Sequence, residues 1–191
     1  MHCWHSFKKS PLETLKFVKG TGLHLSDLRK VNINEANSAI VLAETLDDTL
    51  ASAVDAKSIL IIMNIKKLNP SIHVVVELLK SDSVENAKIA GADEILVRGD
   101  IIAKLLARGV IDPGTIDIME IILTARSGEE IYEDDIPAWL EGKKYEDLVK
   151  LMLDKNATPI ALRSKKGIHV NPSKEYPMDM ESVIYNRKPY F

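Results

Sequence analysis

Two glutamates stand where apolar segments of the sequence end. Glu44 follows the apolar run 39–43, and Glu77 closes the run 72–77. Both runs are typical of parallel strands, whose carboxyl ends meet at one edge of a sheet, where doubly wound folds bind their ligands. Carboxylates at that edge can bind a ribose hydroxyl or supply the hard oxygen ligands that a divalent cation prefers. We therefore take Glu44 and Glu77 as candidate cofactor-binding residues, and Glu77 as the candidate metal ligand.

Other acidic residues fit structural explanations better. Asp47 and Asp48 come at the start of a predicted helix, where the helix dipole favours negative charge. A denser acidic run lies at 129–135 and includes Glu133 and Asp134. Such a run is more typical of a solvated loop than of a calcium site.

Motifs of known catalytic chemistry are missing from the sequence. It holds no G-x-S-x-G, H-E-x-x-H, P-loop or G-x-G-x-x-G pattern. His24, His73 and His169 fall in predicted helices or strands, where a solvated or hydrogen-bonded histidine is commoner than a catalytic one. The H-C-x-H cluster at residues 2–5 is more typical of a frayed terminus than of a metal site. We expect no enzymatic activity.

Composition excludes several classes of protein. The 191 residues carry 25 basic and 28 acidic side chains, so no net positive field attracts nucleic acid or anionic lipid. The longest apolar stretch, 58–65, is far shorter than the roughly 20 residues that cross a bilayer. The first residues lack the pattern of a secretory signal, and one lone cysteine fits a reducing cytoplasm. We expect a cytoplasmic protein without a nucleic-acid partner.

The elements that must position the two glutamates alternate between strand and helix. Apolar runs predict strands at 39–43, 72–77 and 94–97, the first of them buried on both faces, and helical spacing predicts helices at 47–68 and 82–91. Short connections between them favour right-handed crossovers and a parallel sheet. Upstream, a further strand is predicted at 15–19 and a short helix at 25–31, whereas Asp82 and Glu85 predict a capping box.

A second half follows with a different character. Residues 100–107 and 113–123 predict two helices with large apolar faces. These faces either bind a partner or pack on their own domain, and the sequence favours neither. From 127 onward, short strands around a helix at 145–153 predict a small α+β unit, with strands at 129–132, 159–163, 168–170 and 183–185. We expect an α/β protein with three parts: 1–98, a helix-turn-helix linker at 99–126, and 127–191.

Several strings of the sequence fit the pattern of one known family. F-V-K-G-T-G (17–22) and the segment 28–43 are similar to its third strand, short helix and fourth strand. K-L-N-P-S-I-H-V-V-V-E (67–77) and A-G-A-D-E-I-L (90–96) are similar to its next two strands, and E-E-I-Y, G-K-K-Y-E-D-L, P-I-A-L-R and N-P between 129 and 172 to its C-terminal (TrkA-C) lobe. Together these strings resemble the RCK domain, which regulates potassium channels and the Trk- and Ktr-type potassium transporters.

The resemblance implies a regulatory function. RCK units pair through their crossover helices and a following helix-turn-helix, and the dimers assemble into a gating ring, commonly of eight lobes. The ring couples ligand binding to the opening of a potassium pore at the inner face of the membrane. It implies a homo-oligomer bound to a channel or transporter subunit. The implied ligand is a nucleotide (NAD, ATP or ADP) or a divalent cation such as calcium.

The sequence departs from the family pattern in two places. The family's Rossmann-like (TrkA-N) lobe opens with a strand and G-x-G-x-x-G, and this sequence starts after them. A second polypeptide, a preceding segment of a longer chain or a truncation would account for that missing half. Gly20 and Thr21 replace the family's G-D and remain candidate cofactor-binding residues. The calcium ligands of some relatives align with Leu42, Glu77 and Leu79, of which one is acidic.

Two further functions stay open. A nucleotide-binding, oxidoreductase-like remnant would share the doubly wound fold, and it would require a phosphate-binding loop. A free-standing ligand-sensing module would share both lobes and regulate no membrane protein. Binding of NAD to the chain alone would favour the remnant, and failure to bind a pore subunit would favour the module.

Overall fold

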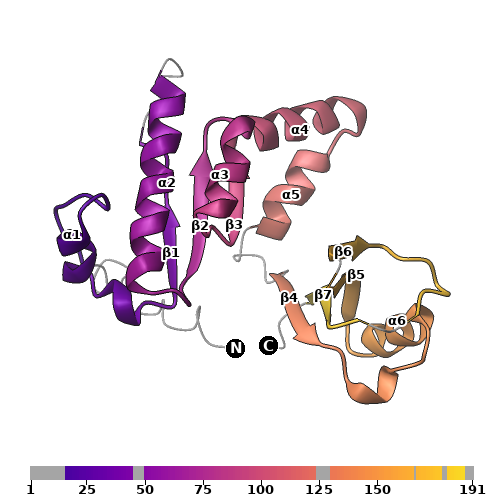
Figure 1. The fold of residues 1–191 in the computed structure, drawn as a ribbon. Coiled ribbons are helices and arrows are strands. Elements are labelled where there is room, and N and C mark those ends of the chain that lie inside the picture. Colours follow the sequence, from indigo (N-terminus) through magenta and orange to yellow (C-terminus); the bar gives the residue numbers. More distant parts are fainter. Residues whose placement is uncertain (1–15, 45–49, 124–129, 166, 178–179, 188–191) are drawn as a thin grey trace. The chain divides into compact units, whose positions relative to one another are not determined.

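The computed structural model describes residues 16–44, 50–123, 130–165, 167–177 and 180–187 (Figure 1). The chain divides into two compact units, with the boundary between Lys104 and Leu105. That boundary lies inside helix α4 (Arg98–Ile111). Among the described helices, none combines the length and hydropathy that a membrane span requires. The three-part division predicted at 98/99 and 126/127 stays a prediction.

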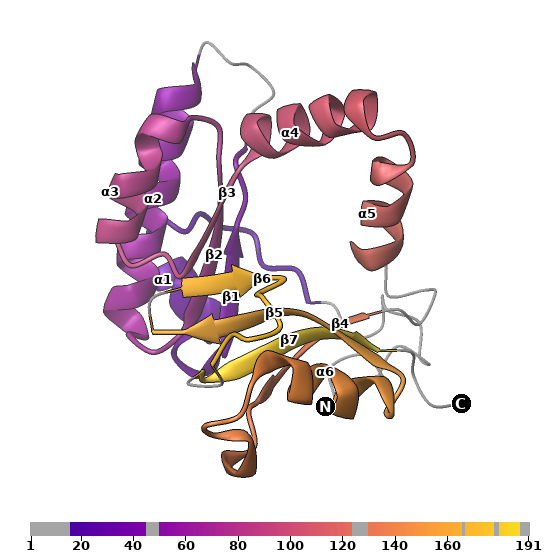
Figure 2. The ribbon, with the colours of Figure 1, turned by 90° about the vertical axis from the view of Figure 1, so that its right-hand side faces the viewer.

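The N-terminal unit contains a three-stranded parallel sheet in the order β1-β2-β3, which confirms the predicted partial Rossmann-like sheet. Its strands are β1 (Ser38–Val41), β2 (His73–Leu78) and β3 (Glu94–Val97), and its helices are α1 (Leu25–Lys30), α2 (Ala51–Leu68) and α3 (Val84–Ile89). Figure 2 shows α2 and α3 together on one face of this sheet. Each connection between neighbouring strands is a helical crossover, as parallel pairing requires.

The core of this unit lies between the sheet and α2. In β2 the side chains alternate, so that Val74, Val76 and Leu78 are fully buried. They meet a stripe on α2 that includes Ile62 and Ile65 and repeats at helical spacing. Apolar side chains recur at every second residue of the strand and at about every 3.6 residues of the helix. The strand and the helix each present one apolar face, and the two faces pack together and exclude water.

The opposite face of the sheet is uncovered in this unit, and this corrects one expectation. The strand at 39–43 was expected to be buried on both faces, but Ile40 is 71% exposed and Leu42 is 66% exposed. Register places Ile40 on the same face as Val75 and Glu94. The helices α2 and α3 both lie on the other face of the described sheet (Figure 2), which explains the exposure of Ile40 and Leu42.

Two other local predictions are wrong. Residues 16–20 form no strand, since no strand of the described part of the chain pairs with them, and Phe17 is 88% exposed. The capping box at Asp82 and Glu85 does not form; a 3₁₀ turn at Ser81–Ser83 leads into α3 without a side-chain cap. Leu15 and Asp47–Asp48 lie outside the described residues.

Two helices follow β3. α4 continues past Gly109 to Ile111, and α5 covers Thr115–Leu123. A Cβ atom at Gly109 would lie 2.8 Å from the side chain of Ile116, so glycine allows the two helices to approach closely. No residue of α4 or α5 is buried.

The C-terminal unit is the predicted small α+β lobe. An antiparallel sheet in the order β4-β7-β5-β6 packs against helix α6 (Tyr145–Leu153), and its strands are β4 (Glu130–Asp135), β5 (Ala157–Ser164), β6 (Gly167–Val170) and β7 (Ser182–Arg187). Leu148 of α6 packs with Leu162 and Tyr185 of the sheet. A 3₁₀ turn at Ala138–Leu140 adds Leu140 to that core.

Candidate functional site

The side chain of Glu77 joins three strand ends at the carboxyl edge of the parallel sheet. Its Oε2 accepts a hydrogen bond from the backbone N–H of Ala43, 3.0 Å away and just beyond β1. Its Oε1 accepts from Nε of Arg98 at 2.7 Å, and Arg98 is the residue that follows β3. Nη2 of Arg98 also donates to the carbonyl of Ala43 at 3.4 Å. We call these three residues the carboxyl-edge clamp.

The electrostatics of the clamp favour a charged Glu77. The hydrogen bond from Arg98 lowers the pKa of the Glu77 carboxyl below its ordinary value; burial opposes that shift and the Ala43 N–H adds to it. The side chains are 17% exposed for Glu77 and 30% for Arg98, so the pair is only partly screened by water. Arg98 therefore neutralises the carboxylate that the sequence marks as a metal ligand.

The other acidic candidate at this edge has a different partner. The Glu44 carboxylate forms an ion pair with Lys57 of α2 and is largely exposed. Glu44 adjoins Ala43, so the backbone brings it beside the clamp, but its carboxylate is paired with the helix. Glu44 and Glu77 lie at the same edge, as expected, with separate cations.

A buried carboxylate at this edge escaped prediction. Asp55 of α2 is fully buried, and its two oxygens accept from the backbone N–H groups of Leu79 and Lys80 at 2.9 and 3.0 Å. These bonds fix the loop that follows β2. The sequence held a signal, since Asp55 is on the stripe that includes Ile62 and Ile65, where an unpaired charge would be costly.

Gly20 and Thr21 lie elsewhere, against α1 and the opposite end of α2. The N–H of Thr21 donates to Oδ2 of Asp27 at 2.9 Å, and Lys30 and this N–H lower the pKa of Asp27. Gly20 faces Asp27 so closely that a Cβ atom would lie 2.7 Å from its Cγ. Asn64 of α2 donates to the carbonyl of Gly22.

The candidate cofactor residues therefore occupy two places. Asn64 binds the carbonyl of Gly22, which follows Gly20 and Thr21, and Lys57, seven residues earlier on the same helix, binds Glu44. At 1.5 Å per residue this separates the two places by about 10 Å along α2. The roles of Gly20, Thr21, Glu44 and Glu77 stay predictions.

The fit of a metal ion depends on its ligands. Calcium takes six to eight oxygen ligands, and no group of three or more candidate ligand side chains occurs among the described residues. A divalent cation at Glu77 would have to displace Arg98 or share the carboxylate with it. The clamp by itself does not supply a calcium coordination sphere.

The acidic residues 133–135, expected in a solvated loop, belong to strand β4. Glu133 accepts from Nε and Nη2 of Arg163 at 2.6 and 3.0 Å, and also from Ser182. Asp134 accepts from the Tyr185 hydroxyl at 2.6 Å. These carboxylates thus bind side chains of other strands in the same sheet, because β4 lies beside β7 and β5 follows β7 in the sheet order.

A hollow of about 470 Å³ lies in the C-terminal unit beside the β5–β6 hairpin. His169 lines it, with Nε2 3.1 Å from the Ser164 hydroxyl and Nδ1 3.3 Å from the Tyr176 hydroxyl. Lys165 and Glu181 add one charge of each sign. Spacing alone could not have found this group, since its members come from different turns and strands.

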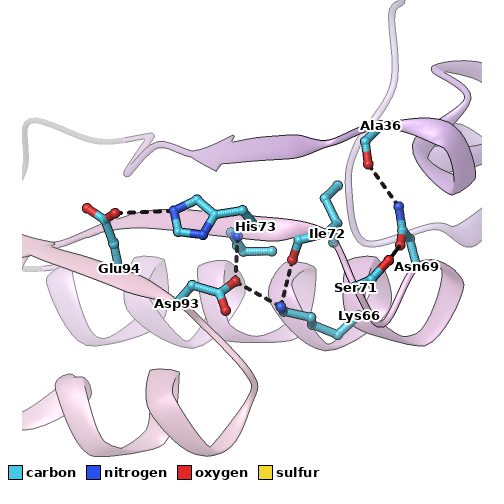
Figure 3. A network of polar contacts seen from close by, with 9 residues as sticks. Ala36, Lys66, Asn69, Ser71, Ile72, His73, Asp93 and Glu94 are labelled. Carbon is cyan, nitrogen blue, oxygen red and sulfur yellow. Dashed lines mark hydrogen bonds and ion pairs between the residues drawn. The ribbon is translucent and has the colours of Figure 1, made fainter. Parts of the chain in front are cut away.

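The amino edge of the parallel sheet carries a separate polar network (Figure 3). Nδ2 of the buried Asn69 donates to the carbonyls of Ile33 and Ala36 at 3.0 and 2.9 Å. Oδ2 of Asp93 accepts from Lys66 and from the N–H of Val74, at 2.8 and 2.7 Å.

These contacts explain two of the family-like strings. L-N-P contributes Asn69 and A-G-A-D contributes Asp93, and both side chains tie loops to the starts of strands. They lie at the edge opposite the carboxyl-edge clamp. Their function in this structure is to position the strands.

Comparison with known proteins agrees with this architecture. The family model described as the calcium-activated potassium channel slowpoke-like RCK domain matches residues 2–76. The structure of the human SLO3 gating ring superposes with a TM-score of 0.73 and 18% identity, over 92% of this chain and 36% of that one. At that identity the likeness shows the fold.

Curated relatives are named as ion channels. The putative potassium channel protein YugO of Bacillus subtilis is 30% identical over 177 residues, which are 90% of this chain and 52% of that protein. The calcium-gated potassium channel TvoK of Thermoplasma volcanium is 25% identical over 161 residues, 84% of this chain and 46% of that protein. The chain thus spans about half the length of these two relatives. The chain is therefore similar to the RCK domain of potassium channels in residues 2–76, and it shares the fold of a gating-ring structure over most of its length.

Proposed function

We propose that this chain is the cytoplasmic regulatory domain of a potassium channel or potassium transporter, and that it has no catalytic activity. The observation that carries the proposal is an apolar surface on α4 and α5 in a chain whose relatives are named as channels. We call this surface the α4–α5 face. It lies beyond Lys104, and its exposed large apolar side chains are Leu106, Val110, Ile111, Ile116, Ile118, Met119, Ile121 and Leu123.

A second copy of the chain is the partner that fits the α4–α5 face. Of the two uses left open by the sequence, packing within the chain is disfavoured, because neither helix has a buried residue. A face of this size is costly to leave in water and marks an interaction surface. Two copies related by a twofold axis can bury the same face against each other.

A ring needs a second surface on each subunit, because each member of a ring contacts two neighbours. α2 and α3 carry one: a largely apolar groove of about 660 Å³, where Leu60, Met63 and Ile89 are more than half exposed. The α4–α5 face and the α2–α3 groove together allow dimers to assemble further. An eight-lobed ring is the assembly that we propose.

The uncovered face of the parallel sheet supports the proposal that further residues complete the Rossmann-like lobe. Parallel sheets are normally covered on both faces. Here α2 and α3 cover one face, whereas the other exposes Ile40 and Leu96. We propose that the first half of a Rossmann-like lobe covers this face, supplied by a preceding segment of a longer protein or by a separate polypeptide.

The regulating ligand is proposed to bind at the carboxyl edge of the sheet. Glu44 and Glu77 lie there, and the candidate classes are a nucleotide (NAD, ATP or ADP) and a divalent cation such as calcium. The 470 Å³ hollow around His169 is a second candidate site, for a small polar ligand. A thermal-shift screen of these compounds would distinguish them, because a ligand that binds only the folded state raises its melting temperature.

The test of the function is a flux measurement. Proteoliposomes that contain the pore or transport subunit with this chain should change their potassium flux when NAD, ATP, ADP or calcium is added. Vesicles that contain the membrane subunit alone should not respond. If the chain neither binds a membrane subunit nor changes its flux, it is a free-standing sensor. If it binds NAD tightly by itself, the oxidoreductase-like remnant is favoured instead.

A further inference from the structure

We propose that Arg98 is a positioning residue that couples the carboxyl edge of the parallel sheet to helix α4. The proposal rests on the proposed regulatory function, to which it adds the route from the sheet to the α4–α5 face. Arg98 follows β3 without a loop and is the first residue of α4. A contact made by its side chain therefore acts directly on the direction in which α4 leaves the sheet.

The guanidinium group joins parts of the chain that are far apart in sequence. It donates to Glu77 of β2 through Nε and to the carbonyl of Ala43 through Nη2. Glu77 in turn accepts from the N–H of Ala43. One side chain thus ties the start of α4 to the ends of both β1 and β2.

Apolar packing does not replace this contact, since no residue of α4 is buried. The first turn also has a polar bond to the segment after β2: the Ser81 hydroxyl donates to Oδ2 of Asp100 at 2.9 Å. Ser81, like Glu77, belongs to the segment at the end of β2. The start of α4 is therefore held to the sheet mainly through polar contacts, which a charged ligand can compete for.

The location of the clamp gives this arrangement a use in regulation. Ligands of parallel sheets bind outside the carboxyl ends of the strands, where the clamp lies. A ligand charge that pairs with Glu77 or with Arg98 weakens their bond to each other. The first turn of α4 is then released, and α4 continues past Lys104 to the residues of the α4–α5 face.

A matched control exists at the opposite edge of the sheet. Lys66 and Asp93 form an ion pair of similar length, 2.8 Å, and Asp93 accepts a backbone N–H just as Glu77 does (Figure 3). This pair joins α2 to the start of β3 and has no bond to α4. Loss of either pair costs stability, but only loss of the clamp should free α4.

The test is amide hydrogen exchange along α4 in the whole chain, at a concentration where all variants have the same mass by light scattering. E77Q and R98M should each raise exchange in residues 102–104 about tenfold or more, as the loss of a charge-assisted hydrogen bond predicts. These are the first amides of α4 with an intrahelical hydrogen bond to lose. R98K should be intermediate, because lysine restores the charge but not the guanidinium's second bond. D93N should leave exchange in these residues unchanged while lowering the melting temperature.

Two results would overturn the proposal. One is unchanged α4 exchange in both E77Q and R98M; the other is an equal rise in D93N, which would reflect general destabilisation. R98K keeps the positive charge, and it therefore provides a second measurement at this position if R98M does not fold. The proposed function is tested separately by the mass of the wild-type chain: a monomer would contradict assembly and leave the coupling between Arg98 and α4 measurable.

Discussion

Replacement of Asn69 by alanine tests how the N-terminal unit is held together. The Asn69 side chain is 7% exposed, and its Nδ2 donates to two backbone carbonyls, those of Ile33 and Ala36. The alanine variant leaves both carbonyls without this donor in a site with little access to water. The Ile33 carbonyl keeps the N–H of Ala36 as a second donor, whereas the Ala36 carbonyl loses its donor. At about 1–3 kcal/mol for the Ala36 carbonyl and about 1 kcal/mol for the bond lost at Ile33, we expect a loss of about 2–4 kcal/mol in the free energy of unfolding.

Asn64 provides the control because it is an asparagine within α2, the helix whose C-cap residue is Asn69. Its Nδ2 also faces two carbonyls, those of Gly22 and Leu23, at 3.3 and 3.0 Å, but at a more exposed position. Water can replace the lost donor in N64A, so the expected loss is below about 1 kcal/mol.

The assay is hydrogen exchange of the β2 amides at increasing urea, which reports on the N-terminal unit alone. N69A should lose at least about 2 kcal/mol of protection, and N64A much less. Equal losses in the two variants, or a loss below about 1 kcal/mol in N69A, would refute the reasoning that burial makes these hydrogen bonds costly to break.

Two further predictions concern backbone conformation and pH. G91A should lower the free energy of unfolding by at least about 1 kcal/mol, because Gly91 has φ +99° and a Cβ atom would lie 3.0 Å from the Lys66 side chain. G99A should not lower it, because a Cβ atom at Gly99 would have no heavy atom within 4 Å. Chemical denaturation of both variants checks this. Ion pairs lower the pKa of Glu77 and Glu133 in the folded chain below the ordinary 4.5, so these carboxylates stabilise it above that value, and the gain is lost as pH falls through the lowered pKa. The melting temperature should therefore change little near neutral pH and fall below about pH 5; a fall that E77Q with E133Q leaves undiminished would contradict this.

Strong periodicity made parts of the fold predictable from the sequence. Helix α6 forms at 145–153 as predicted, since its apolar residues recur at helical spacing and meet a sheet. The predicted α/β class and parallel sheet are confirmed. The segment 16–19 has strand-like composition, but a strand requires a neighbour, and the described chain offers none there. Pattern alone does not report whether that neighbour exists.

The candidate site was predictable only in part. Position in the sequence marked Glu44 and Glu77 as residues at strand ends, and both lie at the carboxyl edge. It did not mark Arg98, which is 21 residues from Glu77 and 55 from Ala43. A pattern indicates which residues end a strand, whereas side chains from distant segments meet only once the chain is folded.

The family-like strings have a different function from the one that their location near a ligand-binding fold suggests. L-N-P and A-G-A-D supply Asn69 and Asp93, and both side chains satisfy backbone groups at the amino edge. These residues keep the strands in register, so that the opposite edge can hold Glu77 and Arg98 in place. Resemblance in these strings therefore predicts the fold better than it predicts the ligand.

Assembly through the α4–α5 face is tested by the mass of the chain in solution, measured by light scattering at micromolar concentration. We expect a dimer or a larger assembly, because two copies bury the α4–α5 face together. L106D places a charge on that face, where Leu106 is 60% exposed, and should reduce the mass to that of a monomer. A wild-type chain that is monomeric at this concentration would contradict assembly through α4 and α5, and with it the proposed gating ring.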